Sequence, residues 1–294
     1  MIRVENLYHS YANNEAYSVK DINFAVAEGE VFGFLGPSGA GKSTTQNLIT
    51  GLIPLQKGNV SVAGYDMRKP DIRMYNKIGV CFEQPNLYAK LNAVENLRFF
   101  AKLFDVPTQD PLELIRMVGL ESAAKKYCGE YSKGMRQRIN FARSMINNPS
   151  LWFLDEPTSG LDPAIADDIK EIIMQKNKAG VTVFLTTHNM YIADELCDRV
   201  AFIVDGEIKL IDSPKELKLR FGKHIVNVEY IKDGKIERES LPTEGEAGKQ
   251  AISDIIRKYT IRTLHTAEAT LEQIFIQVTG KALISNETPD DRTA

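Results

Sequence analysis

The chain has 294 residues, enough for one large domain and a small second one, and its 43% hydrophobic and 26% charged residues are ordinary for a globular protein. A formal net charge of −3 gives no electrostatic reason to expect nucleic acid as a partner. The N-terminus lacks a signal-peptide pattern, and no apolar run approaches the ~18 residues of a membrane-spanning helix. The cysteines Cys81, Cys128 and Cys197 have no metal or redox spacing, so we expect reduced, buried thiols.

The first fifty residues predict a small antiparallel sheet and then a phosphate-binding loop. Residues 2–8 and 17–26 are patterned as two β segments, and the apolar run 31–35 as a buried strand. A glycine-rich loop follows this strand, and a helix running to about Leu52 follows the loop. The loop fits the pattern G-x-x-x-x-G-K-[ST] and consists of Gly36, Pro37, Ser38, Gly39, Ala40, Gly41, Lys42, Ser43 and Thr44.

The residue types in this loop have physical reasons. Gly36, Gly39 and Gly41 allow the backbone to curl so that consecutive N–H groups converge on phosphate oxygens. The following helix adds its positive N-terminal dipole at the same point. Lys42 supplies a positive charge to the β- and γ-phosphates, and the Ser43 hydroxyl reaches a magnesium ion.

The middle of the chain predicts an α/β core. Strands are expected at 59–62, 151–154 and 181–185, the pattern is helical from about 93 to 147, and 199–211 predicts a hairpin. Strands that alternate with helices in this way favour a mainly parallel sheet with flanking helices, beside the antiparallel edge sheet of the N-terminus.

The strand at 151–154 is followed by two adjacent carboxylates, Asp155 and Glu156. Carboxylates are costly at a buried strand end unless a cation or a proton transfer uses them. Asp155 is therefore the candidate magnesium ligand, and Glu156 is the candidate base that orients the attacking water. The strand, the helix and the acidic pair exclude a chance glycine loop. Together they predict a site for ATP and Mg²⁺.

The pattern changes after Pro214. Residues 215–223 predict a solvated helix end and linker, whose charges suit an ordinary surface better than an anionic lipid. Segments 225–230 and 234–239 predict a hairpin, 246–259 a helix and 260–264 an extended stretch.

An apolar helix face follows, formed at i, i+3, i+4 and i+7 by Leu271, Ile274, Phe275 and Val278. Packing within this region and contact with a twin subunit both remain open as its cover. We predict a nucleotide-binding domain at 1–217, a small α+β C-terminal domain at 218–283 and a disordered tail at 284–294.

Five further motifs occur in a fixed order with the phosphate loop and the acidic pair. They are Tyr11, Gln84 within Ile78–Pro85, the loop Tyr131–Gln137, Ser159–Asp162 and His188 after the strand at 181–185. In this order, residues 1 to about 217 resemble the ATP-binding subunit of an ABC transporter. The resemblance implies a P-loop NTPase core with an inserted helical subdomain at about 89–148.

The resemblance also implies roles for these residues. Tyr11 stands where the family places an aromatic ring against adenine, and Gln84 matches the glutamine that links magnesium and water to the transmembrane partner. His188 matches the switch histidine, which we place among the catalytic residues with Glu156, Gln84 and Lys42. The magnesium ligands are then Ser43, Asp155 and Gln84.

The loop Tyr131–Gln137 is similar to the signature loop of the family, L-S-G-G-Q, which reads the ATP held by the other subunit. A head-to-tail dimer follows, in which Ser132 donates to a γ-phosphate and Gly134 allows close backbone approach. Asp162 belongs to the D-loop and to the same nucleotide site. Lys133 departs from the family pattern, and either an added charge near phosphate or simple exposure to solvent is open to it.

The segment 269–280 resembles the ending of ATPases that serve type-2 exporters. We therefore expect a subunit that hydrolyses ATP to energise an exporter of drugs, lipids or polysaccharides. An importer ATPase subunit and a soluble, non-transport ABC ATPase are the alternatives. The expected partners are a polytopic transmembrane permease and a second ATPase subunit, identical or not, at the cytoplasmic face of the cell membrane.

Overall fold

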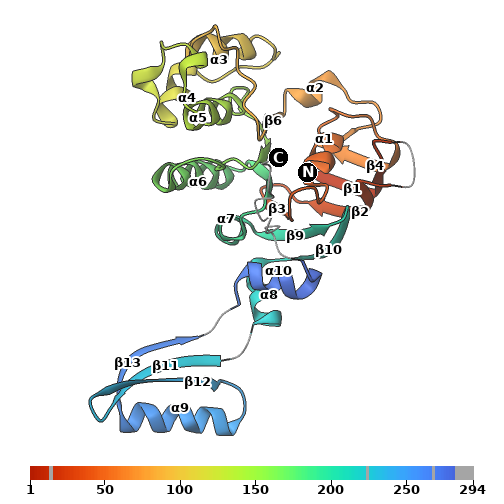
Figure 1. Ribbon diagram of the computed structural model, residues 1–294. Coiled ribbons are helices and arrows are strands. Elements are labelled where there is room, and N and C mark those ends of the chain that lie inside the picture. The colour runs from red at the N-terminus through yellow and green to blue at the C-terminus, as the bar shows by residue number, and fades with distance from the viewer. Residues whose placement is uncertain (13–15, 223–224, 267–268, 282–294) are drawn as a thin grey trace, which may run out of the picture. The chain divides into compact units, whose positions relative to one another are not determined.

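The computed structural model describes residues 1–12, 16–222, 225–266 and 269–281. These divide into two compact units, Met1–Ile211 and Asp212–Lys281 (Figure 1). The division precedes residues 212–217, which the sequence assigned to the first domain. The tail predicted at 284–294 lies outside the described residues. Within the described ranges, no helix is both long and apolar enough to span a membrane.

A six-stranded sheet forms the centre of the first unit, in the order β10-β9-β3-β8-β7-β6. The strands are β3 Val31–Leu35, β6 Ile78–Cys81, β7 Leu151–Asp155, β8 Thr182–Thr187, β9 Arg199–Val204 and β10 Glu207–Asp212. Strand β3 runs parallel to β8 and β9, and β7 runs parallel to β6 and β8. All residues of β3, β7 and β8 are buried, as expected for strands covered on both faces. Because these strands run parallel, their carboxyl ends meet at the same edge of the sheet.

A four-stranded antiparallel sheet, in the order β2-β1-β4-β5, confirms the predicted N-terminal sheet. Its strands are β1 Ile2–His9, β2 Val19–Val26, β4 Lys57–Val62 and β5 Tyr65–Asp66. Phe24 of β2 stacks on Phe32 of β3 with ring centroids 5.3 Å apart, and on Phe184 of β8 at 5.8 Å. These buried rings join the two sheets into one core.

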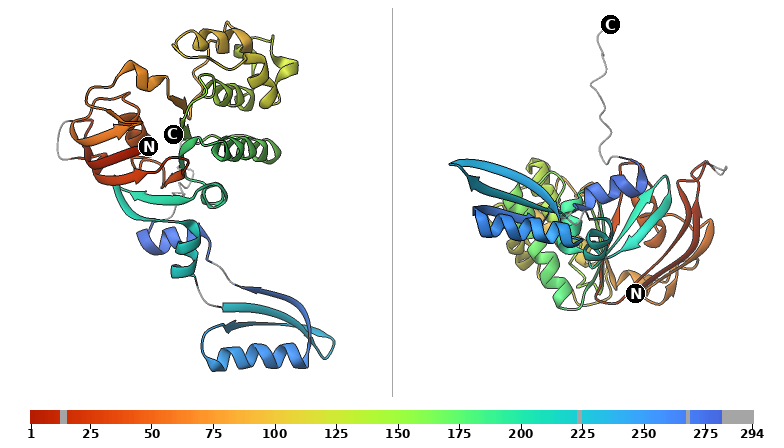
Figure 2. Two further views of the ribbon diagram at one scale, coloured as in Figure 1. Left: turned by 180° about the vertical axis from the view of Figure 1, so that it is seen from behind. Right: turned by 90° about the horizontal axis from the view of Figure 1, so that it is seen from below.

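Seven α-helices are described in the first unit: α1 Lys42–Ile49, α2 Ile72–Tyr75, α3 Ala93–Ala101, α4 Pro111–Met117, α5 Lys133–Arg143, α6 Pro163–Lys178 and α7 Met190–Leu196. Helices α3, α4 and α5 lie together, away from the antiparallel sheet (Figure 1 and Figure 2). The stretch 93–147, predicted to be helical, is therefore divided into separate helices. New helices begin where side chains accept hydrogen bonds from free backbone N–H groups. Asp110 caps α4, which has Pro111 in its first turn, and Ser132 caps α5.

The second unit contains a three-stranded sheet in the order β12-β11-β13. Its elements are α8 Pro214–Phe221, β11 Ile225–Lys232, β12 Lys235–Pro242, α9 Glu246–Lys258, β13 Thr260–Thr266 and α10 Leu271–Thr279. Asp233 and Gly234 both have positive φ, of 50° and 76°, which suits the predicted two-residue hairpin turn. Val226, Val228 and Tyr230 of β11 pack with Ile255 of α9 as a small core.

Helices α8 and α10 pack against each other within the second unit. Leu271, Ile274 and Phe275 are buried in the single chain, whereas Val278 is only half-buried. The predicted apolar face therefore does not need a twin subunit to cover it. Leu217 of α8 is fully buried, so the expectation of a merely solvated helix end at 215–223 was wrong at that position.

The three thiols are predicted to be unreactive in the folded chain. Burial raises the pKa of Cys81 to about 12 and that of Cys128 to about 11, and it also raises the pKa of Cys197. At pH 8 a thiol with a pKa of 12 is a thiolate in roughly one molecule in 10⁴. Iodoacetamide should therefore label the native chain far more slowly than the chain in guanidinium, as measured by intact mass. A native thiol that reacts at the unfolded rate would contradict this burial.

Candidate nucleotide-binding site

The glycine-rich loop lies between β3 and α1 and has the backbone that the motif requires. Gly39 and Gly41 have φ values of 76° and 103°, which side chains with a Cβ rarely adopt. A Cβ at Gly36 would stand 2.2 Å from the carbonyl oxygen of Ile203, and one at Gly41 would stand 2.5 Å from that of Ser18. The loop is therefore closely enclosed on both sides.

Lys42 is the first residue of α1 and is only 8% exposed. Its Nζ donates to the carbonyl oxygens of Gly36 at 2.7 Å and of Pro37 at 3.0 Å. Burial lowers the pKa of Lys42, and the carboxylates Glu156 and Asp155 oppose that change. The loop thus holds the amino group where phosphates would meet it.

Two predicted magnesium ligands, Ser43 and Asp155, come together from different elements. Asp155 ends β7 and accepts hydrogen bonds from the Thr186 hydroxyl of β8 and from the Ser43 hydroxyl of α1. Burial raises the pKa of Asp155, and these two hydrogen bonds oppose the rise. A hydroxyl and a carboxylate side by side are the hard oxygen donors that Mg²⁺ prefers, so the residues fit the metal.

Glu156 and His188 form the second polar pair of the site. The carboxylate accepts from the Thr187 hydroxyl at 2.9 Å and from the His188 backbone N–H at 2.8 Å, and His188 Nδ1 lies 2.6 Å from it. The hydrogen bond with Glu156 raises the pKa of His188. Glu156 has a φ of 47°, which is strained for a residue with a side chain. These contacts fix the carboxylate at the strand end, as a positioned base requires.

Tyr11 lies beside the phosphate loop with most of its ring exposed. Its hydroxyl lies 3.2 Å from the Thr44 hydroxyl, and its ring meets that of His9 edge to face at a centroid distance of 4.8 Å. The side chain is 64% exposed, which leaves ring surface free for an adenine base.

A cavity of about 520 Å³ joins these groups. Its lining residues are Ser18, Ser38, Gly39, Gly41, Lys42, Ser43, Thr44, Glu83, Asp155, Glu156 and His188. Sequence reasoning missed Ser18 and Glu83. Gln84 does not line the cavity, whereas its neighbour Glu83 does, although both side chains are exposed. Nothing local in the sequence distinguishes Ser18.

The signature loop and the D-loop lie against each other and do not line this cavity. Ser132 is exposed and caps α5 by accepting from the Met135 N–H at 3.2 Å. A Cβ on Gly134 would stand 3.5 Å from Leu161, and one on Gly160 would stand 3.2 Å from the Lys133 side chain. Asp162, the exposed residue before α6, also lies outside the cavity.

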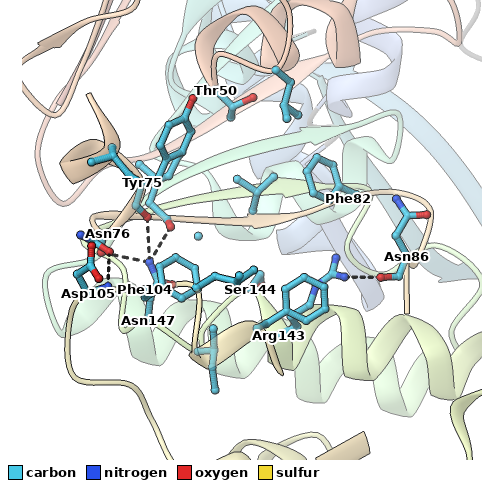
Figure 3. Close-up of a pocket in the computed structure, with 18 of the residues that line it drawn as sticks. Thr50, Tyr75, Asn76, Phe82, Asn86, Phe104, Asp105, Arg143, Ser144 and Asn147 are labelled. Carbon is cyan, nitrogen blue, oxygen red and sulfur yellow. Dashed lines mark hydrogen bonds between the residues drawn. The ribbon is translucent and has the colours of Figure 1, made fainter. Parts of the chain in front are cut away.

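A second cavity of about 770 Å³ is largely apolar and lies between the six-stranded sheet and the helical subdomain (Figure 3). Arg143 of α5 donates to the Asn86 carbonyl at 2.6 Å, and its guanidinium lies 4.5 Å from the centre of the Phe100 ring. Asn147 donates to the Ile78 carbonyl at 2.8 Å. Hydrogen bonds thus hold the walls of this cavity in place. Tyr88, at the border of the cavity, is half exposed.

A glycine-rich loop at the start of a helix, a buried amine and a hydroxyl–carboxylate pair together suit a ligand with several phosphate groups. The fold and this site define the chain as a P-loop nucleoside triphosphatase. A family model described as ABC transporter matches residues 19–159. A fluoroquinolones export ATP-binding protein of Mycobacterium tuberculosis is 48% identical over 284 residues, which cover 96% of this chain and 94% of that protein.

Other relatives agree. The linearmycin resistance ATP-binding protein LnrL of Bacillus subtilis is 32% identical, and the match covers 96% of this chain and 99% of that protein. A dimeric ATP-binding cassette in a post-hydrolysis state, bound to ADP and Pi, has a TM-score of 0.67 at 29% identity, covering 72% of this chain and 98% of its own. The chain therefore belongs to the ABC transporter family, as an ATP-binding ATPase.

Glu156→Gln is expected to retain ATP binding and to slow hydrolysis by roughly 10²–10⁴-fold, the usual effect of losing a general base. The amide keeps one oxygen, which can still accept from the His188 backbone N–H, but it cannot take a proton from water. Release of phosphate by the purified variant measures the rate.

Lys42→Ala is the matched contrast, because it removes the buried amine and should therefore lose most ATP binding.

Size exclusion of Glu156→Gln with ATP should show a stable dimer if nucleotides are shared between subunits. Turnover by Glu156→Gln close to that of the unaltered chain would remove Glu156 as the base.

Proposed function

We propose that this chain energises an exporter of drug-like molecules, working at the cytoplasmic face of the membrane with a polytopic permease. The observation that carries this proposal is the 48% identity with a fluoroquinolones export ATP-binding protein, which extends over nearly the whole of both chains. The similarity to a linearmycin resistance ATP-binding protein also extends through the second unit. Export therefore has more support than the importer or soluble alternatives.

Hydrolysis follows from the positions of the polar groups. Lys42 and the loop N–H groups bind the β- and γ-phosphates, and Ser43 and Asp155 would hold the magnesium ion. When bound, that ion would neutralise part of the charge on the phosphates. Glu156 orients the attacking water and accepts its proton, while His188 holds the Glu156 carboxylate in place.

We propose that a second ATPase subunit completes each site. Ser132, Gly134 and Asp162 do not line the phosphate cavity of their own chain, which supports a role for them at the nucleotide of another subunit. The N–H groups at the start of α5 are suited to an anion. The similar cassette structure bound to ADP and Pi is dimeric, which supports the same arrangement here.

The 770 Å³ cavity is the proposed docking site for a cytoplasmic segment of the permease. The loop between β6 and α3 borders both cavities: Glu83 lines the phosphate cavity, and Phe82, Asn86 and Tyr88 line the apolar one (Figure 3). A displacement of this loop at the phosphates therefore reaches the apolar walls within a few residues. Such a short connection can bias the permease by the state of the nucleotide.

Cysteine crosslinking tests the docking site. Single cysteines at Tyr88 and Leu103, which are 50% and 63% exposed at the border of the apolar cavity, should crosslink to the permease, and their yields should change with nucleotide. The natural cysteines are buried, so the introduced thiol is the reactive one. A cysteine at Ile276 of α10, which is 43% exposed, is the control. Crosslinks from position 276 alone would refute the docking site.

We also propose that the second unit supports or regulates dimerisation and is not required for nucleotide binding. Every residue that lines the phosphate cavity precedes Asp212. A chain that ends at Asp212 should therefore bind ATP with a Kd within a few-fold of that of the full chain, while its hydrolysis should depend differently on protein concentration. Circular dichroism confirms folding. A folded, shortened chain that binds no ATP would show that the domain boundary is wrong.

A further inference from the structure

Glu83 is the third carboxylate of the phosphate cavity, beside Asp155 and Glu156. Glu83 lies in the non-helical segment that follows β6. Asp155 is the last residue of β7, and Glu156 comes directly after it. The three acids therefore reach the cavity from two neighbouring parallel strands. Gln84, the next residue, is exposed and does not line the cavity. Both side chains are exposed, but only that of Glu83 lines the cavity, so the carboxylate, and not the amide, borders the space where phosphates would lie.

The three carboxylates differ in how they are bound. Asp155 accepts from Thr186 and Ser43, and Glu156 accepts from Thr187 and His188. Within the described ranges, Glu83 has no hydrogen bond to its carboxylate and no ion pair. Its oxygens are therefore the ones still available to a ligand in this cavity.

The charge of Glu83 acts on the other groups of the site. Burial lowers the pKa of Lys42, and Glu83 is among the carboxylates that oppose this change. The hydrogen bond with Glu156 raises the pKa of His188, and the charge of Glu83 adds to that rise. These effects place the carboxylate in the same electrostatic environment as the phosphate-binding amine.

An unpartnered carboxylate that faces ATP repels the phosphates unless a cation lies between them. Like charges a few ångströms apart repel each other, and solvent screens this repulsion in part because Glu83 is exposed. A divalent ion reverses the sign of this contribution, because it attracts both the carboxylate and the phosphates. An amide at the same place has no net charge, so it would not repel the phosphates, and its oxygen would attract the cation less strongly than a carboxylate does.

We propose that Glu83, in place of Gln84, is a ligand of the ATP-bound magnesium ion, directly or through a coordinated water. It thereby makes nucleotide binding by this chain unusually dependent on a divalent cation. This inference rests on the proposed magnesium-dependent ATPase function and assigns the metal residue that the sequence had placed one position later.

Two titrations of the full chain test the proposal, and neither measures turnover. In the first, a fluorescent ATP analogue is added in excess chelator. In the second, Mn²⁺ is added to the chain saturated with a non-hydrolysable ATP analogue, and free Mn²⁺ is followed by electron paramagnetic resonance. Glu83→Gln should tighten metal-free nucleotide binding by about three- to tenfold and weaken Mn²⁺ binding by about tenfold. General damage to the site would instead weaken both.

Gln84→Ala is the matched control at the adjacent, exposed position, and it should change neither affinity. Glu83→Asp keeps the charge and should retain weak metal-free nucleotide binding. The proposal is overturned if Glu83→Gln alters neither titration, if it weakens both, or if Gln84→Ala alone weakens Mn²⁺ binding. An unaltered chain that binds no nucleotide would instead refute the proposed function, so the two failures are distinguishable.

Discussion

Burial of charge at one edge of a parallel sheet is the constraint on which the rest of this structure depends. Lys42, Asp155 and Glu156 are each less than a tenth exposed, and unpaired charges in such a place are costly. Loop carbonyls compensate Lys42, and Thr186 and Thr187 donate to the two carboxylates. Both threonines end β8, whose parallel register pairs Asp155 with Thr186. A slip of β8 by one residue would turn these hydroxyls away and leave two buried anions unsatisfied.

The same edge limits the size of nearby residues. The phosphate loop passes between Ile203 at the end of β9 and Ser18 at the start of β2, and only glycine fits at positions 36 and 41. The hairpin turn after β9 adds a hydrogen bond, because the Gly206 N–H donates to the Ala40 carbonyl at 3.0 Å. Strands from both sheets therefore hold the loop in shape. The conformation that binds phosphate is built into the fold, which lowers the entropic cost of binding.

What could be predicted from the sequence is what short-range chemistry determines. The phosphate loop, the acidic pair and the Asp-Gly hairpins each depend on residues adjacent in the chain, and the structure has them as expected. Ser18 could not be found, because only the packing of the two sheets brings it to the cavity. The sequence also could not show that Glu83 lines the cavity and Gln84 does not, since the two polar residues are adjacent and both are exposed. The burial of Leu217 likewise depends on tertiary packing, which periodicity in a charged segment does not show.

Helix α5 connects the signature loop, at its start, with the loop that follows β6, near its end. Its first turn carries the signature loop, which is not part of the cavity of its own chain. About two turns later, the buried Asn140 donates to the Phe82 carbonyl at 2.7 Å, and after about one more turn Arg143 donates to the Asn86 carbonyl at 2.6 Å. These two hydrogen bonds attach α5 to the loop that contains Glu83. A helix is stiff over this length, so in the proposed dimer a phosphate that draws the start of α5 toward another subunit would also pull on that loop. Because the loop also forms a wall of the apolar cavity, one rigid element would join the nucleotide sites to the proposed docking site of the permease.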